Sequence, residues 1–129
     1  MESSERQRVL VVDDEPGICE ALQVVLDSEG YEVVTAGSCK EALDACARVL
    51  PEIVICDIFM PERDGLETIK DLRISYPGLR IVAMTGGGEY GLYDLSAVAR
   101  HLGADRALLK PFDSEDLLEC VRELLAGRA

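Results

Sequence analysis

Apolar and polar residues alternate along this chain with two different periods. Short runs of consecutive apolar residues, many of them β-branched, are separated by longer stretches in which apolar residues recur every three or four positions. Unbroken apolar runs are typical of strands covered on both faces, and the longer period is typical of helices with one buried face. We expect strands at residues 9–12, 31–36, 53–56, 81–84 and 107–109, each followed by a helix.

This succession of strand–helix units predicts an α/β fold. Strands joined by helices run parallel, so the expected architecture is a doubly wound, five-stranded parallel sheet with helices on both faces. The run at 31–36 is more polar than the others, which indicates the edge of the sheet. The length of 129 residues fits a single domain spanning residues 1–129, and the sequence has no repeat or linker.

Residues that favour helix ends mark several boundaries. Pro16 suits a first helical turn, and Gly30 suits the position just past a helix end. Ser38 and Glu41 have the spacing of a capping box. The first helix has one apolar face, made of Ile18, Ala21, Leu22, Val25 and Leu26. Further helices are expected at 38–48, 65–75 and 94–102, and a last one, capped by Ser114, is expected to bury Leu117, Leu118, Val121, Leu124 and Leu125.

Charge and cysteine content narrow the class of protein. The net charge of −12 argues against direct binding to nucleic acid or to anionic membrane surfaces. The first eight residues are polar and charged, and no apolar run approaches the roughly 20 residues of a membrane span. The five cysteines lack CxxC spacing and lie mostly in apolar runs, so we expect free core thiols and a soluble, cytoplasmic protein.

Polar residues that can take part in catalysis or metal binding follow four of the expected strands. Asp13 and Asp14 come directly after the first strand, Asp57 after the third, Thr85 after the fourth and Lys110 after the fifth. The carboxyl ends of parallel strands share one edge of the sheet, where sites of α/β proteins form. We therefore expect these side chains in one crevice.

Three carboxylates in one crevice repel one another unless a positive charge lies among them. Lys110 alone does not balance three negative charges, and oxygen ligands favour a hard divalent ion such as Mg²⁺. With Mg²⁺ and Lys110 holding a phosphoryl group by its oxygens, one carboxylate is free to act as a nucleophile. Thr85 is then placed to donate a hydrogen bond to a phosphoryl oxygen.

Five sequence segments together resemble the receiver domains of two-component response regulators. The segments are Val11-Val12-Asp13-Asp14-Glu15-Pro16, Cys56-Asp57-Ile58-Phe59-Met60-Pro61, Asp64-Gly65, Thr85 and Lys110-Pro111-Phe112. The resemblance covers about residues 7–125. It is a resemblance to receiver domains of the stand-alone, single-domain type. It implies a flavodoxin-like sheet with strand order 2-1-3-4-5.

The resemblance also implies a role for each site residue. Asp57 is the expected phosphoacceptor, and Lys110 and Thr85 are expected to contact the phosphoryl group. Asp13, Asp14, Asp57 and the backbone carbonyl of Phe59 are the expected ligands of Mg²⁺. The Lys110–Pro111 peptide bond is expected to be cis.

The implied function is a phosphorylation-dependent switch in a phosphorelay. The phosphoryl group comes from a phosphohistidine on a sensor histidine kinase or a histidine phosphotransfer protein, and phosphorylation changes the affinity for a protein partner. Such a protein is not a conventional enzyme, because it promotes only its own phosphorylation and dephosphorylation. We expect a monomer or weak dimer without direct contact to nucleic acid or membrane.

Two features depart from the family pattern. Residue 107 is alanine, where the family usually has tyrosine or phenylalanine as a partner to the threonine. The segment 86–93 is rich in glycine. We hypothesise that it is mobile and takes over the switching role, with Tyr90 or Tyr93 filling the space above Ala107. The output surface is expected to include Arg100, His101, Arg106, Glu119 and Glu123.

Other functions fit the sequence less well. A degenerate receiver used as a phosphorylation-independent docking module would not need all the key residues, which are present here. An aspartyl-nucleophile phosphohydrolase would carry DxD after the first strand, where this chain has Asp13-Asp14-Glu15. A flavodoxin-like cofactor site needs donors after that strand, and carboxylates would repel a phosphate. The glycines at 86–88 lack the GxxxxGK[ST] phosphate-loop pattern.

Overall fold

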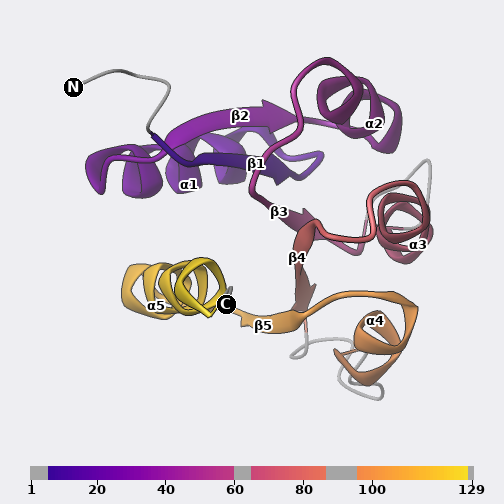
Figure 1. Ribbon diagram of the computed structural model, residues 1–129. Coiled ribbons are helices and arrows are strands. Elements are labelled where there is room, and N and C mark those ends of the chain that lie inside the picture. Colours follow the sequence, from indigo (N-terminus) through magenta and orange to yellow (C-terminus); the bar gives the residue numbers. More distant parts are fainter. Residues whose placement is uncertain (1–5, 60–64, 87–95, 128–129) are drawn as a thin grey trace.

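The fold is built on a five-stranded parallel sheet with strand order β2-β1-β3-β4-β5. The computed structural model describes residues 6–59, 65–86 and 96–127. The strands are β1 (Arg8–Val12), β2 (Glu32–Ala36), β3 (Ile53–Asp57), β4 (Arg80–Gly86) and β5 (Arg106–Lys110). Every neighbouring pair is parallel (Figure 1), which confirms the predicted sheet and its strand order.

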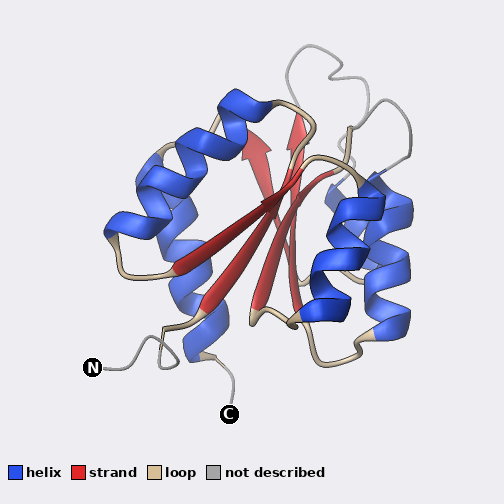
Figure 2. Ribbon diagram, turned by 90° about the horizontal axis from the view of Figure 1, so that it is seen from above, coloured by secondary structure: helices blue, strands red, loops and turns tan. Residues whose placement is uncertain are grey.

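Helices cover both faces of this sheet, as Figures 1 and 2 show. The helices are α1 (Pro16–Ser28), α2 (Cys39–Arg48), α3 (Gly65–Ser75), α4 (Ser96–Leu102) and α5 (Ser114–Ala126). Helices α1 and α5 pack on one face, and α2, α3 and α4 pack on the other. The doubly wound arrangement predicted from the strand–helix pattern is therefore confirmed.

The central strands are buried because helices cover them on both sides. Along β1, Val9 and Val11 contact the α1–α5 core, whereas Leu10 and Val12 contact the core under α2 and α3. Successive strand side chains point to opposite faces, so an unbroken apolar run fills both cores. Burial of each such side chain stabilises the fold by roughly 1.5–3 kcal/mol. The edge strands β2 and β5 are less buried than the central strands. The position of β2 agrees with the prediction from its polar sequence.

Both ends of α1 lie where the sequence predicts them. Pro16 is the first helical residue. Gly30 has a φ of 92°, a left-handed conformation that glycine adopts without strain. The Gly30 N–H donates to Asp27 O (3.0 Å) and the Tyr31 N–H donates to Leu26 O (3.3 Å), which satisfies carbonyls of the last turn.

The other two predicted caps differ in detail from the structure. The Ser38 hydroxyl accepts from the Glu41 N–H as expected, but the Glu41 carboxylate accepts from the Gly37 N–H (2.7 Å). The prediction of Ser114 as the cap of α5 was wrong, because Asp113 caps this helix in a reciprocal capping box with Asp116. Asp113 lies one residue before Ser114 and three residues before Asp116, so the two carboxylates accept both hydrogen bonds of the box.

The structure tests the predictions made for the cysteines and for membrane-spanning segments. All five cysteines are buried and free, as expected. Burial raises the pKa of the Cys46 thiol to about 11, so this thiol is protonated at neutral pH. In the part of the chain that the structure describes, every helix is too short or too polar to cross a membrane.

Candidate functional site

The predicted site residues meet at the carboxyl edge of the sheet. Asp57 is the last residue of β3, and Asp13 follows the last residue of β1, whose Val12 pairs with Cys56. Carboxylate oxygens of Asp13, Asp14 and Asp57 all lie within 4.8 Å of one another. Asp13 and Asp57 are only 1% and 4% exposed. Three acidic groups, two of them buried, thus share one small space.

Hydrogen bonds from the surrounding backbone fix Asp13. Its N–H donates to Ala36 O (3.0 Å), which joins the end of β1 to the end of β2. Its Oδ1 accepts from the Glu15 N–H (3.0 Å), and its carbonyl accepts from the Cys19 thiol (3.3 Å). These bonds leave Oδ2 directed toward the centre of the site, 3.4 Å from Lys110 Nζ.

Asp57 lies in a less favourable environment for a charge. Its Oδ1 accepts from the Phe59 N–H (3.4 Å) and lies 3.3 Å from Lys110 Nζ. Burial raises the pKa of the Asp57 carboxyl above its ordinary value, while Lys110 offsets part of that rise and Asp13 adds to it. The environment therefore disfavours the negative charge at Asp57 more than its one cationic neighbour favours it.

Lys110 is the cation that joins the two buried carboxylates. The side chain reaches from the end of β5 to both Asp13 and Asp57. Burial acts to lower the pKa of the Lys110 ammonium, but the carboxylates of Asp57 and Asp13 outweigh it and raise the pKa. Lys110 is therefore charged at neutral pH. The Lys110–Pro111 bond is cis, as expected.

Thr85 provides a buried hydroxyl at the end of β4. It is 2% exposed, and its Oγ1 has no hydrogen-bond partner in the part of the chain that the structure describes. A buried hydroxyl without a partner is costly, and such groups often mark a functional site. Gly86, the next residue, pairs with Lys110, so Thr85 and Lys110 lie at neighbouring strand ends.

These groups fit a hard divalent cation and a phosphoryl group. All the acidic ligands are oxygens, and three negative charges exceed the single charge of Lys110. Phe59 lies at the rim, with a side chain that is 48% exposed. The expected roles of Asp14 and of the Phe59 carbonyl toward Mg²⁺ remain predictions. Met60, Pro61 and Asp64 of the sequence motif lie outside the described residues.

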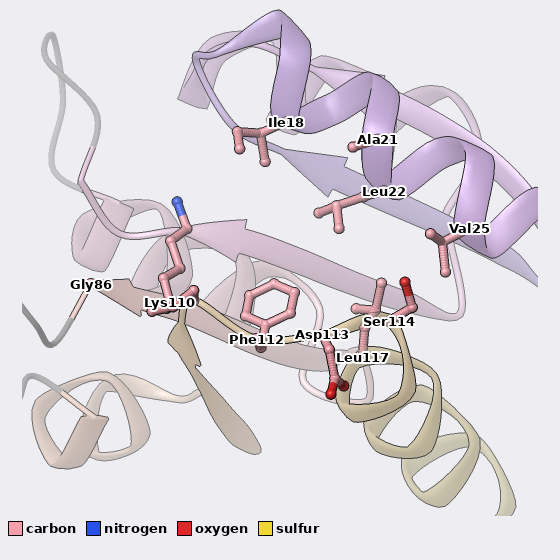
Figure 3. A pocket seen from close by; sticks show the side chains of 11 residues that line it. Ile18, Ala21, Leu22, Val25, Gly86, Lys110, Phe112, Asp113, Ser114 and Leu117 are labelled. Carbon is pink, nitrogen blue, oxygen red and sulfur yellow. The ribbon is translucent and has the colours of Figure 1, made fainter.

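A groove between α1 and α5 opens beside this site, and sequence reasoning missed it. The groove has a volume of about 580 Å³ and is mainly apolar. In Figure 3, Ile18, Leu22 and Val25 of α1 face Phe112 and Leu117 across it, and Lys110 lies at one end. Of the α1 face expected to be apolar, only Leu22 and Leu26 are buried. Partial exposure of the others depends on how far α1 and α5 lie apart, which local sequence does not encode.

A second hollow lies along the free edge of β5. It has a volume of about 410 Å³ and includes Ala107, Leu109 and Phe112 in its wall. Leu109 is 48% exposed. The small side chain of Ala107 does not fill this region. The residues expected at the output surface, Arg100, His101, Arg106, Glu119 and Glu123, are all exposed. The segment 87–95, with Tyr90 and Tyr93, lies outside the described residues, so its expected role is untested.

The fold and the acidic edge of the sheet define a class of protein. The family model for the response regulator receiver domain matches residues 9–122. The chain belongs to this family.

Known relatives agree with that assignment. Sporulation initiation phosphotransferase F of Bacillus subtilis is 32% identical over 92% of this chain and 94% of its own length. The transcriptional regulatory protein ZraR of Klebsiella oxytoca is 36% identical over 96% of this chain, which spans only 27% of that protein. A CheY-like receiver domain from Methanospirillum hungatei has a similar structure, with a TM-score of 0.87, 30% identity and coverage of 95% and 96% of the two chains.

Proposed function

We propose that this protein is a phosphorylation-dependent switch in which Asp57 accepts a phosphoryl group in the presence of Mg²⁺. The donor is a phosphohistidine on a sensor histidine kinase or a histidine phosphotransfer protein. The observation that carries the proposal is the convergence of Asp13, Asp14 and Asp57 with Lys110 at one sheet edge. Membership of the receiver family supports the same reaction.

The charges of the site explain the need for a metal ion. Asp13, Asp14, Asp57 and the Phe59 carbonyl would hold Mg²⁺, whose two positive charges, together with the charge of Lys110, would balance the three carboxylates before the phosphoryl group arrives. Lys110 already lies between Asp13 and Asp57 and would pair with a further phosphoryl oxygen. The anionic phosphoryl group would therefore not be repelled by the three carboxylates.

The residues of the chain perform the transfer as follows. A carboxylate oxygen of Asp57 attacks the phosphorus, and the new O–P bond replaces the P–N bond to the donor histidine. The electron pair of the broken bond remains on the imidazole nitrogen, which takes up a proton. The Thr85 hydroxyl, which lacks a partner among the described residues, then donates to a phosphoryl oxygen. This new bond favours one of two conformations, which a partner protein reads.

The α1–α5 groove is a suitable contact surface for the phosphodonor protein. The donor must bring its histidine to Asp57, so it must touch the rim of the site. The groove adjoins that rim at Lys110 and offers the partly exposed side chains of Ile18, Val25 and Phe112 as apolar contacts. Its apolar lining suits an amphipathic helix, because such a helix places its apolar face in a hydrophobic groove. The free buried thiols are consistent with a cytoplasmic location for this exchange.

Neither alternative function has a specific observation in its favour. A phosphorylation-independent docking module would not require a partly buried lysine paired with two buried carboxylates. For a phosphohydrolase, the described part of the chain offers one clustered carboxylate set, which the receiver reaction already uses.

Phosphorylation by a small-molecule donor tests the proposal directly. The protein is incubated with acetyl phosphate with and without MgCl₂, and its intact mass is measured. We expect the added mass of one phosphoryl group only with Mg²⁺, and none in Asp57→Asn. Asp44→Asn is the matched control, since Asp44 is an exposed aspartate on α2, and it should react like the wild type. An unmodified wild type, or equal modification of Asp57→Asn, would rule the proposal out.

A further inference from the structure

The first residue of α3 lies against the backbone of the phosphoacceptor strand. The Gly65 N–H donates to Ile58 O (3.0 Å), and the Ile58 N–H donates to Met84 O of β4 (3.2 Å). A Cβ atom added to Gly65 would lie 2.2 Å from Asp57 O and 2.3 Å from Ile58 Cα. Both distances are far below any normal contact, and both neighbours are backbone atoms. The start of α3 thus contacts the Asp57–Ile58 peptide more closely than any side chain would allow.

Space, and not backbone conformation, is what requires glycine at this position. The described glycines with a positive φ are Gly30 and Gly103, and Gly65 is not among them. Its backbone angles are therefore open to other residues, and only the missing Cβ makes it special. Gly78, in the turn between α3 and β4, has no atom within 4 Å of the equivalent Cβ position.

From this contact we infer that Gly65 is a positioning residue for Asp57. The inference rests on the proposed function of Asp57 and extends it to a residue outside the charged site. The carbonyl that α3 touches belongs to Asp57 itself, and the next peptide leads to Phe59, whose N–H holds Asp57 Oδ1. A side chain at position 65 would push this segment or α3 by nearly an ångström.

A shift of that size matters because group transfer depends on close alignment. Reactive groups must stay within about 0.5 Å of their working geometry. Lys110 lies at 3.3 Å from Asp57 Oδ1, so a displaced carboxylate would also lose its cation. The same movement would displace the Phe59 carbonyl, which is proposed to bind Mg²⁺. Gly65 therefore acts through Asp57 and Phe59, without touching the phosphoryl group.

The test compares Gly65→Ala with two controls. Gly78→Ala adds the same methyl group where space is free. Leu26→Ala creates a cavity under α1, on the opposite face of the sheet, and lowers stability without touching Asp57. For each variant, thermal unfolding, Mg²⁺ affinity and the rate constant for phosphorylation by acetyl phosphate are measured.

We expect Gly65→Ala to be folded, to phosphorylate roughly 10- to 100-fold more slowly and to bind Mg²⁺ more weakly. Gly78→Ala and Leu26→Ala should keep rates near that of the wild type, although Leu26→Ala is less stable. Wild-type rates and Mg²⁺ affinity in Gly65→Ala would overturn the inference. Slowing of Leu26→Ala to the same extent would overturn it too, since stability alone would then explain the effect. Failure of Gly65→Ala to fold in MgCl₂ would make Gly65 a folding residue and overturn its positioning role.

A spectroscopic measurement separates this inference from the proposed function. Amide ¹H–¹⁵N shifts of Ile58 and Phe59 report the backbone position next to Asp57 without any phosphodonor. We expect Gly65→Ala to move them and Gly78→Ala to leave them unchanged. If the wild type is never phosphorylated, the proposed function fails, and these shifts still decide whether Gly65 sets the position of Asp57. Unmoved amides in folded Gly65→Ala would overturn the positioning role.

Discussion

Asp57 illustrates how a buried charge is kept at the expense of stability. Its carboxylate is nearly inaccessible, lies near Asp13 and has Lys110 as its cationic partner. Burial raises the pKa of Asp57, which means that its ionised form is better stabilised in the unfolded chain than in the folded one. Without a divalent cation, ionisation of Asp57 therefore opposes folding.

The substitution Asp57→Asn should consequently raise stability in the absence of Mg²⁺. At neutral pH we expect the free energy of unfolding to rise by roughly 1 kcal/mol, because the amide removes a buried charge at similar volume. Lys110 keeps Asp13 as a partner in this variant. The measurement is urea unfolding in EDTA.

The pH dependence of this difference follows from the raised pKa of Asp57. The wild type should lose stability relative to Asp57→Asn as pH rises above the ordinary aspartate pKa of about 3.9, and the gap should close at lower pH. Asp44→Asn should leave stability within about 0.5 kcal/mol of the wild type. An Asp57→Asn variant that is less stable than the wild type at neutral pH would show that the Lys110 attraction dominates instead.

Among the elements, α3 is fixed at both ends by contacts distant in sequence. Its first residue lies against the β3 backbone, and Arg73 in its last turn donates to the carbonyls of Leu79 (2.6 Å) and Gly103 (2.8 Å). Arg73 also pairs with Asp105, whose carboxylate accepts from the Ile81 N–H (2.8 Å). One side chain thus links the end of α3 to the start of β4 and to the α4–β5 turn.

Loss of the hydrogen bonds of Arg73 should lower the stability of the fold. We expect Arg73→Ala to lower the free energy of unfolding by about 2–3 kcal/mol, because partly buried carbonyls lose their donor. Arg106→Ala is the control, since Arg106 has one exposed ion pair, with Glu123, and should lose less than about 1 kcal/mol. Urea unfolding of both variants at neutral pH checks the difference. Equal losses would mean that the carbonyl contacts of Arg73 contribute little.

In the whole molecule, negative charge is in large excess, and the fold brings a few of the acidic groups together at the carboxyl edge of the sheet. The net charge is −12, and three of the acidic groups share one site. General screening by salt weakens the repulsion among surface carboxylates, whereas a divalent ion bound at the site also stabilises the folded state by mass action. These two effects can be separated by experiment.

Mg²⁺ should stabilise the wild type more than a sodium salt of equal ionic strength. At 100 times the dissociation constant the extra stabilisation is about 2.7 kcal/mol. Asp13→Asn should lose most of it and Asp44→Asn should retain it, because only Asp13 belongs to the cluster. Thermal unfolding in matched salts provides the measurement. If both salts act equally on the wild type, the acidic cluster does not select Mg²⁺.

Local sequence determined the elements and the chemistry of the site. Apolar runs fixed the strands, because a run such as residues 9–12 has to be covered on both faces. Parallel connection then put Asp13, Asp57 and Lys110 at one edge. Helix periodicity was less informative about burial, since Leu124 and Leu125 of α5 are only partly buried.

Tertiary structure decided what depends on distances between elements. The α1–α5 groove, the contact of Gly65 with Asp57 and the bonds of Arg73 join residues that no local pattern relates. The cap of α5 also depended on backbone geometry, which favoured Asp113 over Ser114. Sequence periodicity specifies which face of each element is apolar, whereas the separation and depth of packed elements follow from how all the side chains fill the core together.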